Sequence, residues 1–448
     1  MPFVADPAEG ARVHALDRAH VFHSWSAQGA LNPFDMAAAE GSYVWDWEGN
    51  RYLDLSSMLV NVNIGHQHPK VIKAIQDQAA ELATVAPQHA NRARGEAAQR
   101  IAGLAPDGMN KIFFTNGGAD AVENAIRMAR LHTGRRKVLS FYRSYHGNTG
   151  AAIASTGDPR RWPNEYAEGH VHFFGPYLYR SVFWATSEEQ ECERALAHLE
   201  QVITFEGPAT IATILIESVV GTAGVLVPPA GYLEGVRALC DKHGIMLILD
   251  EVMAGFGRTG KWFAFQNWDV KPDLIPFAKG SNSGYVPVGG VIISDEIAAT
   301  FDERVFPGGL TYSGHPLACA SIVASIDAMK EEGIIENARS IGENVLGPGL
   351  RELAEKHPVI GEARGLGVFW ALDLVTDRAT REPLAPYGGT SEAMVKLGGA
   401  MKANGALPFI NFNRLHVVPP CTVTEAEAKE GLEILDKAFA AISSYYTG

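Results

Sequence analysis

The middle of the chain alternates short, continuous apolar runs with stretches of helical spacing. The apolar runs lie at residues 111–114, 137–141, 212–216, 246–249, 274–277 and 288–293. Between them, residues 122–129 place their apolar side chains on one helical face, and residues 232–243 predict a helix that stops at Gly244. Continuous apolar strands separated by helices are typical of a mainly parallel sheet covered on both faces. We therefore expect an α/β fold.

The two ends of the chain follow a different pattern. Residues 43–47 and 51–55 predict a hairpin around a turn at 48–50, and helical spacing begins after Pro69. The C-terminal third predicts long helices at 318–329 and 425–442, with a strand at 367–372 between them. We expect a large domain at 65–320 and a small α+β domain made from residues 1–64 and 321–448.

Charge and composition limit the classes of partner. The formal net charge of the 448-residue chain is -13, which disfavours nucleic acid and anionic membranes as partners. The N-terminus has no signal-peptide pattern, and no apolar stretch is long enough to span a membrane. The four cysteines are scattered, which favours a reducing compartment. We expect a cytoplasmic protein whose partners are small molecules.

Polar residues follow several of the predicted strands, where open α/β sheets bind their ligands. Asp250 ends the run at 246–249, Lys279 follows the run at 274–277, and Glu217 ends the run at 212–216. Pyridoxal phosphate (PLP) needs a lysine that forms a Schiff base with its aldehyde and an acid that holds a proton on its pyridine nitrogen. The pair of Asp250 and Lys279 therefore predicts a PLP site.

Two further segments fit the same cofactor, although each has a simpler reading. Gly117, Gly118 and Ala119 lie between a strand and a helix, where free N–H groups bind a phosphate; a tight turn alone would look the same. Tyr145, followed by His146, could stack on a flat ring or lie in a surface loop.

Two other motifs suggest ligands that we do not expect. Residues 255–261 fit both G-x-G-x-x-G and G-x-x-x-x-G-K, but Trp262 stands where a P-loop needs Ser or Thr. We interpret this segment as a flexible glycine loop near the site. His66 and His68 lack further metal ligands at suitable spacing, so we expect polar residues that cap the helix after Pro69 and no metal site.

The chain resembles class III aminotransferases of the PLP fold-type I superfamily, and is close to the ω-transaminases. The resemblance runs from about Gly41 to the C-terminus. It rests on residues 63–69, 115–123, 144–147, 249–252, 255–260, 278–280 and 311–316. This family has a large domain with a mainly parallel seven-stranded sheet flanked by helices, and a small domain built from both chain ends. The chain departs from the usual Ser-Gly-Ser-Glu at 117–120, which removes hydroxyl donors from the phosphate.

The resemblance implies a role for each matching residue. Lys279 would bind the cofactor and carry protons, with Asp250 at the pyridine nitrogen and Glu217 near the ring hydroxyl. The rest of the cofactor site would comprise Tyr145, His146, Val252, Gly117, Gly118, Ala119 and, from a second subunit, Thr311. The last of these implies a homodimer with shared active sites. The substrate would meet Leu59, Val60, Tyr145 and Arg414, with Leu59 and Val60 making the pocket wide and aliphatic.

The implied reaction is a ping-pong transamination from a primary amine or ω-amino acid to a keto acid, with pyruvate expected. Three main alternatives remain, besides a racemase on the same scaffold. One is an aminomutase similar to glutamate-1-semialdehyde aminomutase, which needs no separate acceptor. Another is an aminotransferase of the 4-aminobutyrate and 2-oxoglutarate type. The third is a silent ligand-binding protein, which the intact Lys279 and Asp250 disfavour.

Overall fold

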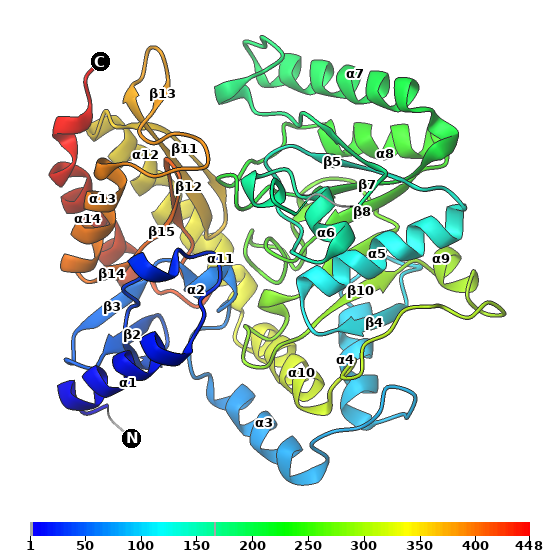
Figure 1. Cartoon of the computed structure of the whole chain (residues 1–448), viewed down its shortest axis with the longest axis horizontal. Coiled ribbons are helices and arrows are strands. Elements are labelled where there is room, and N and C mark those ends of the chain that lie inside the picture. The colour runs from blue at the N-terminus through cyan, green and yellow to red at the C-terminus, as the bar shows by residue number, and fades with distance from the viewer. Residues whose placement is uncertain (1–2, 165–166) are drawn as a thin grey trace.

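The computed structural model of the protein describes residues 3–164 and 167–448. Its largest sheet has seven strands in the order β4-β10-β9-β8-β7-β5-β6 (Figure 1). They are β4 (Lys111–Thr115), β5 (Lys137–Phe141), β6 (His170–Phe173), β7 (Ile211–Glu217), β8 (Met246–Asp250), β9 (Leu274–Phe277) and β10 (Gly289–Ile293). β10 is antiparallel to both neighbours and the other pairings are parallel, which confirms the predicted mainly parallel sheet.

The central strands of this sheet are mostly apolar because helices cover both of its faces. In β8, Ile248 packs in one cluster with residues of α5 (Gly118–Thr133), such as Ala125. Its neighbours Leu247 and Leu249 belong to the opposite cluster, which includes Leu199 of α7 (Glu188–Glu206) and residues of α8 (Tyr232–His243). Successive side chains of a strand point to opposite faces, so a run without polar residues follows from burial on both sides.

Further helices surround this sheet and extend beyond it. They are α3 (Pro69–Glu81), α4 (Arg92–Ala102), α6 (Gly150–Ser155), α9 (Asp295–Ala299) and α10 (Pro316–Glu331). α10 packs against both α3 and α4 in the lower part of Figure 1. The predicted domain boundary at residue 320 therefore falls inside a continuous helix, and the division into domains stays a prediction. Among the described residues, no helix is long and apolar enough to cross a membrane.

Both chain ends build the second part of the molecule, to the left in Figure 1. One sheet has the order β1-β2-β3-β14, in which the C-terminal β14 pairs in parallel with β3. The other has the order β11-β12-β16-β15, with β13 paired to β12. The strands are β1 (Met36–Glu40), β2 (Tyr43–Asp46), β3 (Arg51–Asp54), β11 (Ile360–Leu366), β12 (Phe369–Asp377), β13 (Glu382–Pro383), β14 (Ala406–Leu407), β15 (Phe409–Asn411) and β16 (Arg414–Val417).

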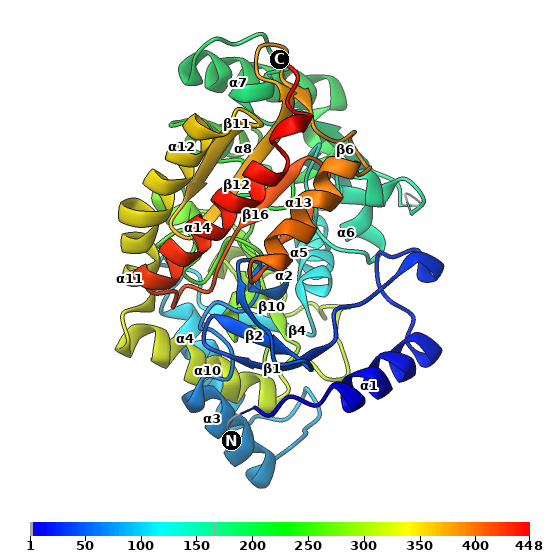
Figure 2. The same cartoon turned by 90° about the vertical axis from the view of Figure 1, so that its left-hand side faces the viewer.

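The helices of this part are α1, α2 and α11 to α14, several of which lie side by side in Figure 2. They are α1 (Pro7–His20), α2 (Ser57–Val60), α11 (Ile334–Ile341), α12 (Gly347–Lys356), α13 (Glu392–Ala403) and α14 (Glu425–Ala441), with a π-helical turn at Gly342–Leu346. The predicted hairpin is confirmed as β2 and β3. The predicted strand at 367–372 starts two residues late, because Gly367, at φ +56°, forms the turn between β11 and β12.

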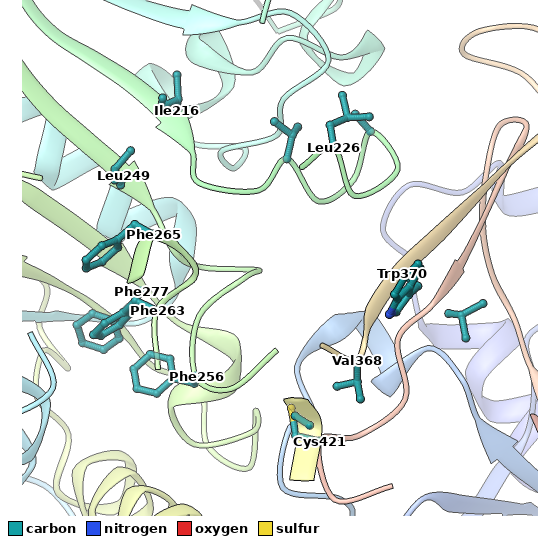
Figure 3. Close-up of a cluster of buried hydrophobic side chains, with 14 of the residues drawn as sticks. Ile216, Leu226, Leu249, Phe256, Phe263, Phe265, Phe277, Val368, Trp370 and Cys421 are labelled. Atoms are coloured by element: carbon teal, nitrogen blue, oxygen red, sulfur yellow. The ribbon is translucent and has the colours of Figure 1, made fainter. Parts of the chain in front are cut away.

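Aromatic rings fill the core beneath the carboxyl ends of the central strands. The ring centroid of Phe256 lies 5.4 Å from that of Phe263 and 5.9 Å from that of Phe277. Phe263 in turn stacks on Phe265 at 5.7 Å (Figure 3). Val368 and Trp370, from the second part of the molecule, belong to the same buried cluster. The two parts therefore share one apolar core next to the strand ends.

Candidate active site

Three neighbouring strands deliver Glu217, Asp250 and Lys279 to one edge of the sheet. Glu217 and Asp250 are register partners at the ends of β7 and β8. Lys279 opens a short 3-10 turn (Lys279–Ser281) just after β9. Its φ of +34° is unusual for a residue with a side chain, and such strain concentrates at functional sites. The sequence predicted that these three residues follow strands of one sheet, and the topology places them at the same edge.

The Lys279 amine lies in a setting that disfavours its charge. Burial lowers the pKa of Lys279, and the carboxylates of Asp250 and Glu217 offset part of that effect. Within residues 3–164 and 167–448, no hydrogen bond or ion pair is formed by Nζ. A lysine with a lowered pKa is available as a neutral nucleophile and base.

Asp250 is buried and held by two donors. Its Oδ2 lies 2.7 Å from Nδ1 of His146, and its Oδ1 accepts the Val252 N–H at 3.0 Å. The other imidazole nitrogen of His146, Nε2, is buried without a hydrogen-bond partner among the described residues. The sequence motif at 144–147 therefore brings a histidine to the acid as well as a tyrosine to the site.

The segment predicted to bind phosphate forms the N-terminus of α5. The Ala121 N–H donates to Gly117 O at 3.1 Å, so the three N–H groups before it have no acceptor within the helix. A Cβ at Gly118 would lie 2.7 Å from Val252 Cγ1. A Cβ at Gly147, where φ is +129°, would lie 2.5 Å from Ala119 Cβ. Only glycine allows these backbones to approach, which leaves an anion site at the helix end.

Glu217 joins the tyrosine loop to the turn that follows β7. Its carboxyl group accepts the Tyr145 N–H at 3.2 Å and the Gly221 N–H at 2.8 Å. Burial raises the pKa of Glu217 to about 7, while His146 opposes this effect. Asn411, from β15, donates to Thr222 O at 2.8 Å in the same turn. The second part of the molecule thus reaches the site through this turn.

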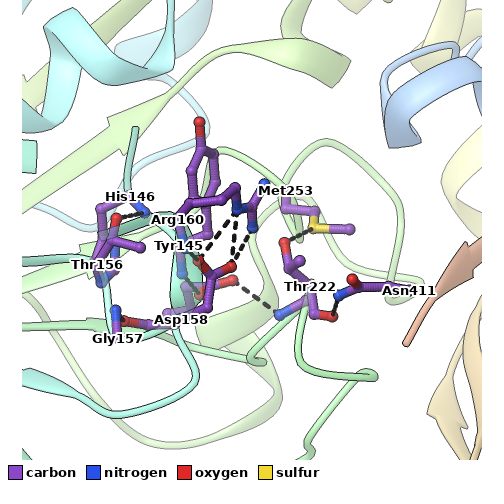
Figure 4. A network of polar contacts seen from close by, with 12 residues as sticks. Tyr145, His146, Thr156, Gly157, Asp158, Arg160, Thr222, Met253 and Asn411 are labelled. Atoms are coloured by element: carbon purple, nitrogen blue, oxygen red, sulfur yellow. Dashed lines mark hydrogen bonds and ion pairs between the residues drawn. The ribbon is translucent and has the colours of Figure 1, made fainter. Parts of the chain in front are cut away.

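Sequence reasoning missed Arg160, which Figure 4 shows stacked on Tyr145. Its guanidinium carbon lies 3.6 Å from the centre of the tyrosine ring. The Asp158-Pro159 pair before it signals a turn, here the 3-10 helix η2 (Pro159–Arg161). Nothing in the sequence indicates that this turn lies against Tyr145, because the contact depends on how the segment after α6 folds back.

The predicted substrate residues do not all gather at the site. Val60 is fully buried in an apolar cluster that includes Val219 and Met253, whereas Leu59 is 52% exposed. Arg414, in β16, is only 8% exposed, and its guanidinium makes no hydrogen bond or ion pair with any described residue. Thr311 is exposed on the surface of the single chain. The substrate roles of Leu59, Val60 and Arg414, and the phosphate contact of Thr311 in a second subunit, stay predictions.

Two readings of sequence motifs need correction. The segment 255–261 is a hydrogen-bonded turn rather than a flexible loop, and residues 255–260 are buried. Its Arg258 is fully buried and donates from Nη2 to Asn63 Oδ1 at 2.8 Å. His68 occupies the position before α3, but its side chain does not cap the helix, since Nε2 lies 3.1 Å from Glu332. His66 instead contacts Asp54, at 2.9 Å.

These residues fit PLP in charge and shape. The Lys279 amine has no hydrogen-bond partner among the described residues, and it matches the cofactor's aldehyde. The acid of Asp250, one strand away, matches the pyridine nitrogen, and the N–H groups at the start of α5, which have no acceptor within that helix, match the phosphate. The absence of a side chain at Gly118 lets the N-terminus of α5 approach Val252, two residues after Asp250. Fold and site together define a PLP-dependent enzyme of fold type I.

The comparisons with known proteins agree. The sequence matches the family described as aminotransferase class-III over residues 25–439. It is 32% identical to a taurine–pyruvate aminotransferase of Bilophila wadsworthia, over 97% of this chain and 98% of that protein. The fold matches a taurine:2-oxoglutarate aminotransferase of Bifidobacterium kashiwanohense, solved with PLP and glutamate, with a TM-score of 0.95, 41% identity and 100% of both chains covered.

An (S)-enantioselective ω-transaminase of Thermomicrobium roseum is also similar, with a TM-score of 0.91, 37% identity, and 96% of this chain and 98% of that chain covered. The chain therefore belongs to the class III aminotransferases. It is a PLP-dependent aminotransferase whose structural neighbours include ω-transaminases. The predicted family, cofactor and enzyme class are confirmed.

Proposed function

We propose that this enzyme moves the amino group of a primary amine or ω-amino acid to pyruvate by a ping-pong mechanism. The observation that carries the proposal is Arg414, whose side chain is largely buried and whose guanidinium forms no hydrogen bond or ion pair with the described residues. A buried charge without a partner is costly, and burial lowers the pKa of Arg414 accordingly. The carboxylate of a keto acid would supply the missing partner through charge-assisted hydrogen bonds.

Arg414 packs against the same turn that contacts Glu217 of the candidate site. A Cβ at Gly224 would lie 2.7 Å from Arg414 Cδ, so the arginine packs against the turn at 221–224. The same turn donates the Gly221 N–H to Glu217. One relative is named for taurine and pyruvate, which agrees with pyruvate as the acceptor and an ω-amino acid as the donor.

The side chains divide the work of proton transfer and charge stabilisation. PLP, when bound, withdraws electrons from the substrate carbon and keeps the amino group between the two half-reactions. Lys279 would take the proton from that carbon and return it, since burial lowers its pKa and so favours the neutral form of the amine. Asp250, supported by His146, would hold the proton on the pyridine nitrogen.

A homodimer with shared active sites is part of the proposal. Thr311 is exposed on the surface of the single chain. In the proposed dimer it would contact the cofactor phosphate bound by the other subunit. Several large apolar side chains are also exposed, among them Phe22, Trp25, Val305 and Tyr312. Exposed apolar side chains of this size favour association with another chain.

A second acceptor, 2-oxoglutarate, is favoured by one observation. The relative with 41% identity is named a taurine:2-oxoglutarate aminotransferase and was solved with glutamate. Initial rates with one donor and either acceptor separate the two candidates. Turnover of a donor without any keto acid would instead favour the aminomutase reaction.

Replacing the lysine tests the proposed chemistry directly. Lys279→Ala should reduce the rate to the background of the assay, a loss of at least about 1,000-fold, because both the covalent attachment and the proton carrier disappear. The visible absorbance band of the cofactor bound to the lysine should disappear as well. Lys73→Ala, which removes an exposed lysine paired with Asp77, serves as the control and should keep both properties. Steady transamination by Lys279→Ala would contradict the proposal.

A further inference from the structure

A strained backbone segment lies against the turn that carries Lys279. Within α2 (Ser57–Val60), φ is +44° at Ser57, +59° at Met58 and +58° at Val60. A positive φ is unfavourable for residues with a side chain, above all for a β-branched valine. Such a conformation persists only where the surrounding structure holds it in place, and it is typical of functional sites.

Asp54 holds this segment in its strained form. Its side chain is fully buried, and its Oδ1 accepts the Ser56 N–H at 3.1 Å and the Ser56 hydroxyl at 2.6 Å. Its Oδ2 accepts the Met58 N–H at 3.1 Å and lies 2.9 Å from Nε2 of His66. One carboxylate therefore binds the chain on both sides of Ser57 and anchors it to the segment before α3.

The residues after α2 contact the turn of the catalytic lysine. Nδ2 of Asn61 donates to the backbone oxygen of Ser283, four residues after Lys279, at 3.3 Å. A Cβ at Gly280, next to Lys279, would lie 2.2 Å from Nδ2 of Asn63. The anchored segment and the lysine turn are therefore packed together without room for a further atom at Gly280.

The segment also brings apolar side chains to the edge of the site. Val60 is buried in a cluster with Val219 and Met253, which lie shortly after the two acids of the site in the sequence. Leu59 is 52% exposed, so much of its side chain is left unpacked in the single chain. An apolar side chain in this position can contact the apolar part of a donor, and its place depends on the backbone that Asp54 holds.

We propose that Asp54 is a positioning residue that determines which amine donors the enzyme accepts, because it holds Leu59 and Val60 as a wall of the donor pocket. This inference rests on the proposed aminotransferase function, and Asp54 acts through the backbone of α2. A wall fixed by buried hydrogen bonds favours compact donors, since a bulky amine must displace it. When the carboxylate is replaced, the strained backbone relaxes and the preference for compact donors declines.

The first test compares a compact donor, butylamine, with a bulky one, 1-phenylethylamine, in Asp54→Asn. An asparagine side chain has only one acceptor oxygen, so the segment loses part of its hydrogen bonding. With pyruvate as acceptor, kcat/KM for butylamine should fall about 10-fold, whereas that for 1-phenylethylamine should change by less than about twofold. Ser56→Ala removes a single hydrogen bond to Asp54 and should shift the ratio in the same direction, which keeps the test decisive if Asp54→Asn folds poorly.

Asp46→Asn is the matched control for a purely structural effect. Asp46 is also a buried aspartate of the N-terminal sheet, and it accepts the Asn50 N–H at 2.8 Å and the Tyr52 hydroxyl at 2.8 Å. These contacts stabilise the hairpin of β2 and β3. The substitution should lower the midpoint of urea unfolding and leave the ratio of kcat/KM for the two donors within about twofold of the wild type.

A rescue experiment separates the anchor from the strain that it holds. Met58→Gly, added to Asp54→Asn, removes the penalty of the positive φ and should restore most of the preference for butylamine. Met58→Ala, added to Asp54→Asn, removes the same side chain but keeps the penalty, so it should restore none.

Three outcomes would overturn the role of Asp54. They are an equal loss for both donors in Asp54→Asn, a ratio that does not change, and equal ratios in the two double variants. If the wild type transfers no amino group from any donor to pyruvate or 2-oxoglutarate, the proposed function itself fails, whatever the variants do.

Discussion

At the scale of single residues, the site depends on acids that differ in how they are held. Asp250 contacts an imidazole and accepts a backbone N–H. Glu217 lies one strand away and accepts two backbone N–H groups. Burial has a larger effect on its pKa than these hydrogen bonds do, and raises the pKa to about 7. Two carboxyl groups in register thus have different hydrogen-bond partners.

The raised pKa of Glu217 predicts a dependence of stability on pH. The folded protein holds the Glu217 proton more tightly than the unfolded chain, whose glutamate has its ordinary pKa of 4.5. The resulting stabilisation is fully present below pH 4.5 and is lost as the pH rises through about 7. Glu217→Gln cannot lose this proton. Its free energy of unfolding relative to the wild type should therefore rise by about 2–3 kcal/mol between pH 4.5 and 8.

Urea unfolding of both proteins across this pH range measures the difference. Any constant cost of the substitution, such as a weakened hydrogen bond to Gly221, cancels in the comparison. A difference between the two proteins that does not change with pH would show that the proton affinity of Glu217 is ordinary in the folded state.

At the scale of elements, the sequence predicted the strands that are buried on both faces of the sheet. The central strands were found because each is a continuous apolar run, as in Leu247 to Leu249 of β8. The sequence did not predict β6, because this edge strand carries His170 and His172 and, among the described strands, pairs with β5 alone. The short β1, β14 and β15 were missed as well, since their pairing joins distant segments that no local pattern reveals.

The candidate site also combines residues that the sequence predicts with contacts that only the structure reveals. Lys279, Asp250 and Glu217 could be predicted because strand ends of one sheet meet at one edge. The contact between Tyr145 and Arg160, and that between His146 and Asp250, depend on the course of loops. Such contacts have no period or spacing in the sequence, so only the structure reveals them.

Glu251 illustrates how one side chain fixes the junction after β8. Its carboxylate accepts the Ser218 hydroxyl at 2.5 Å and the N–H groups of Ala264 and Phe265 at 2.8 and 3.1 Å. Ala264 and Phe265 belong to the 3-10 turn η5 (Ala264–Asn267). The fully buried carboxylate therefore joins β7, β8 and this aromatic turn beneath the active site.

Glu251→Gln should weaken this junction, because an amide has only one oxygen to accept three donors. At least one buried N–H or hydroxyl would lose its acceptor, at a cost of about 1–3 kcal/mol in the free energy of unfolding. Urea unfolding at one pH measures the loss. Glu200→Gln changes an exposed glutamate paired with Lys242 and should stay within about 0.5 kcal/mol of the wild type. Equal effects of the two substitutions would argue against this role of Glu251.

At the scale of the whole molecule, Arg258 links segments from the two parts of the fold. Its guanidinium donates to Asn63 near the N-terminus and to the backbone oxygens of Val418 and Pro419 near the C-terminus. The Arg258 carbonyl accepts the Val368 N–H at 3.1 Å. The strand ends that carry Lys279 and Asp250 are thereby fixed against the part of the molecule that carries Arg414.

The proposed homodimer would complete this arrangement with a residue from a second chain. If Lys279 of one subunit shares an active site with Thr311 of the other, a mixed dimer can carry one substitution on each subunit. A dimer of Lys279→Ala with Thr311→Arg would contain one site with an intact lysine and an intact threonine. The other site would carry both substitutions.

This arrangement predicts that two inactive proteins restore activity when their subunits are exchanged. Thr311→Arg should be nearly inactive by itself, because the arginine side chain would block the phosphate site. After mild unfolding and refolding of an equal mixture, half of the dimers are mixed, so about a quarter of the wild-type activity should return. Mixing without unfolding is the control and should restore none. If Thr311 acts within its own subunit, the refolded mixture stays as inactive as its components, since every site then lacks one of the two residues.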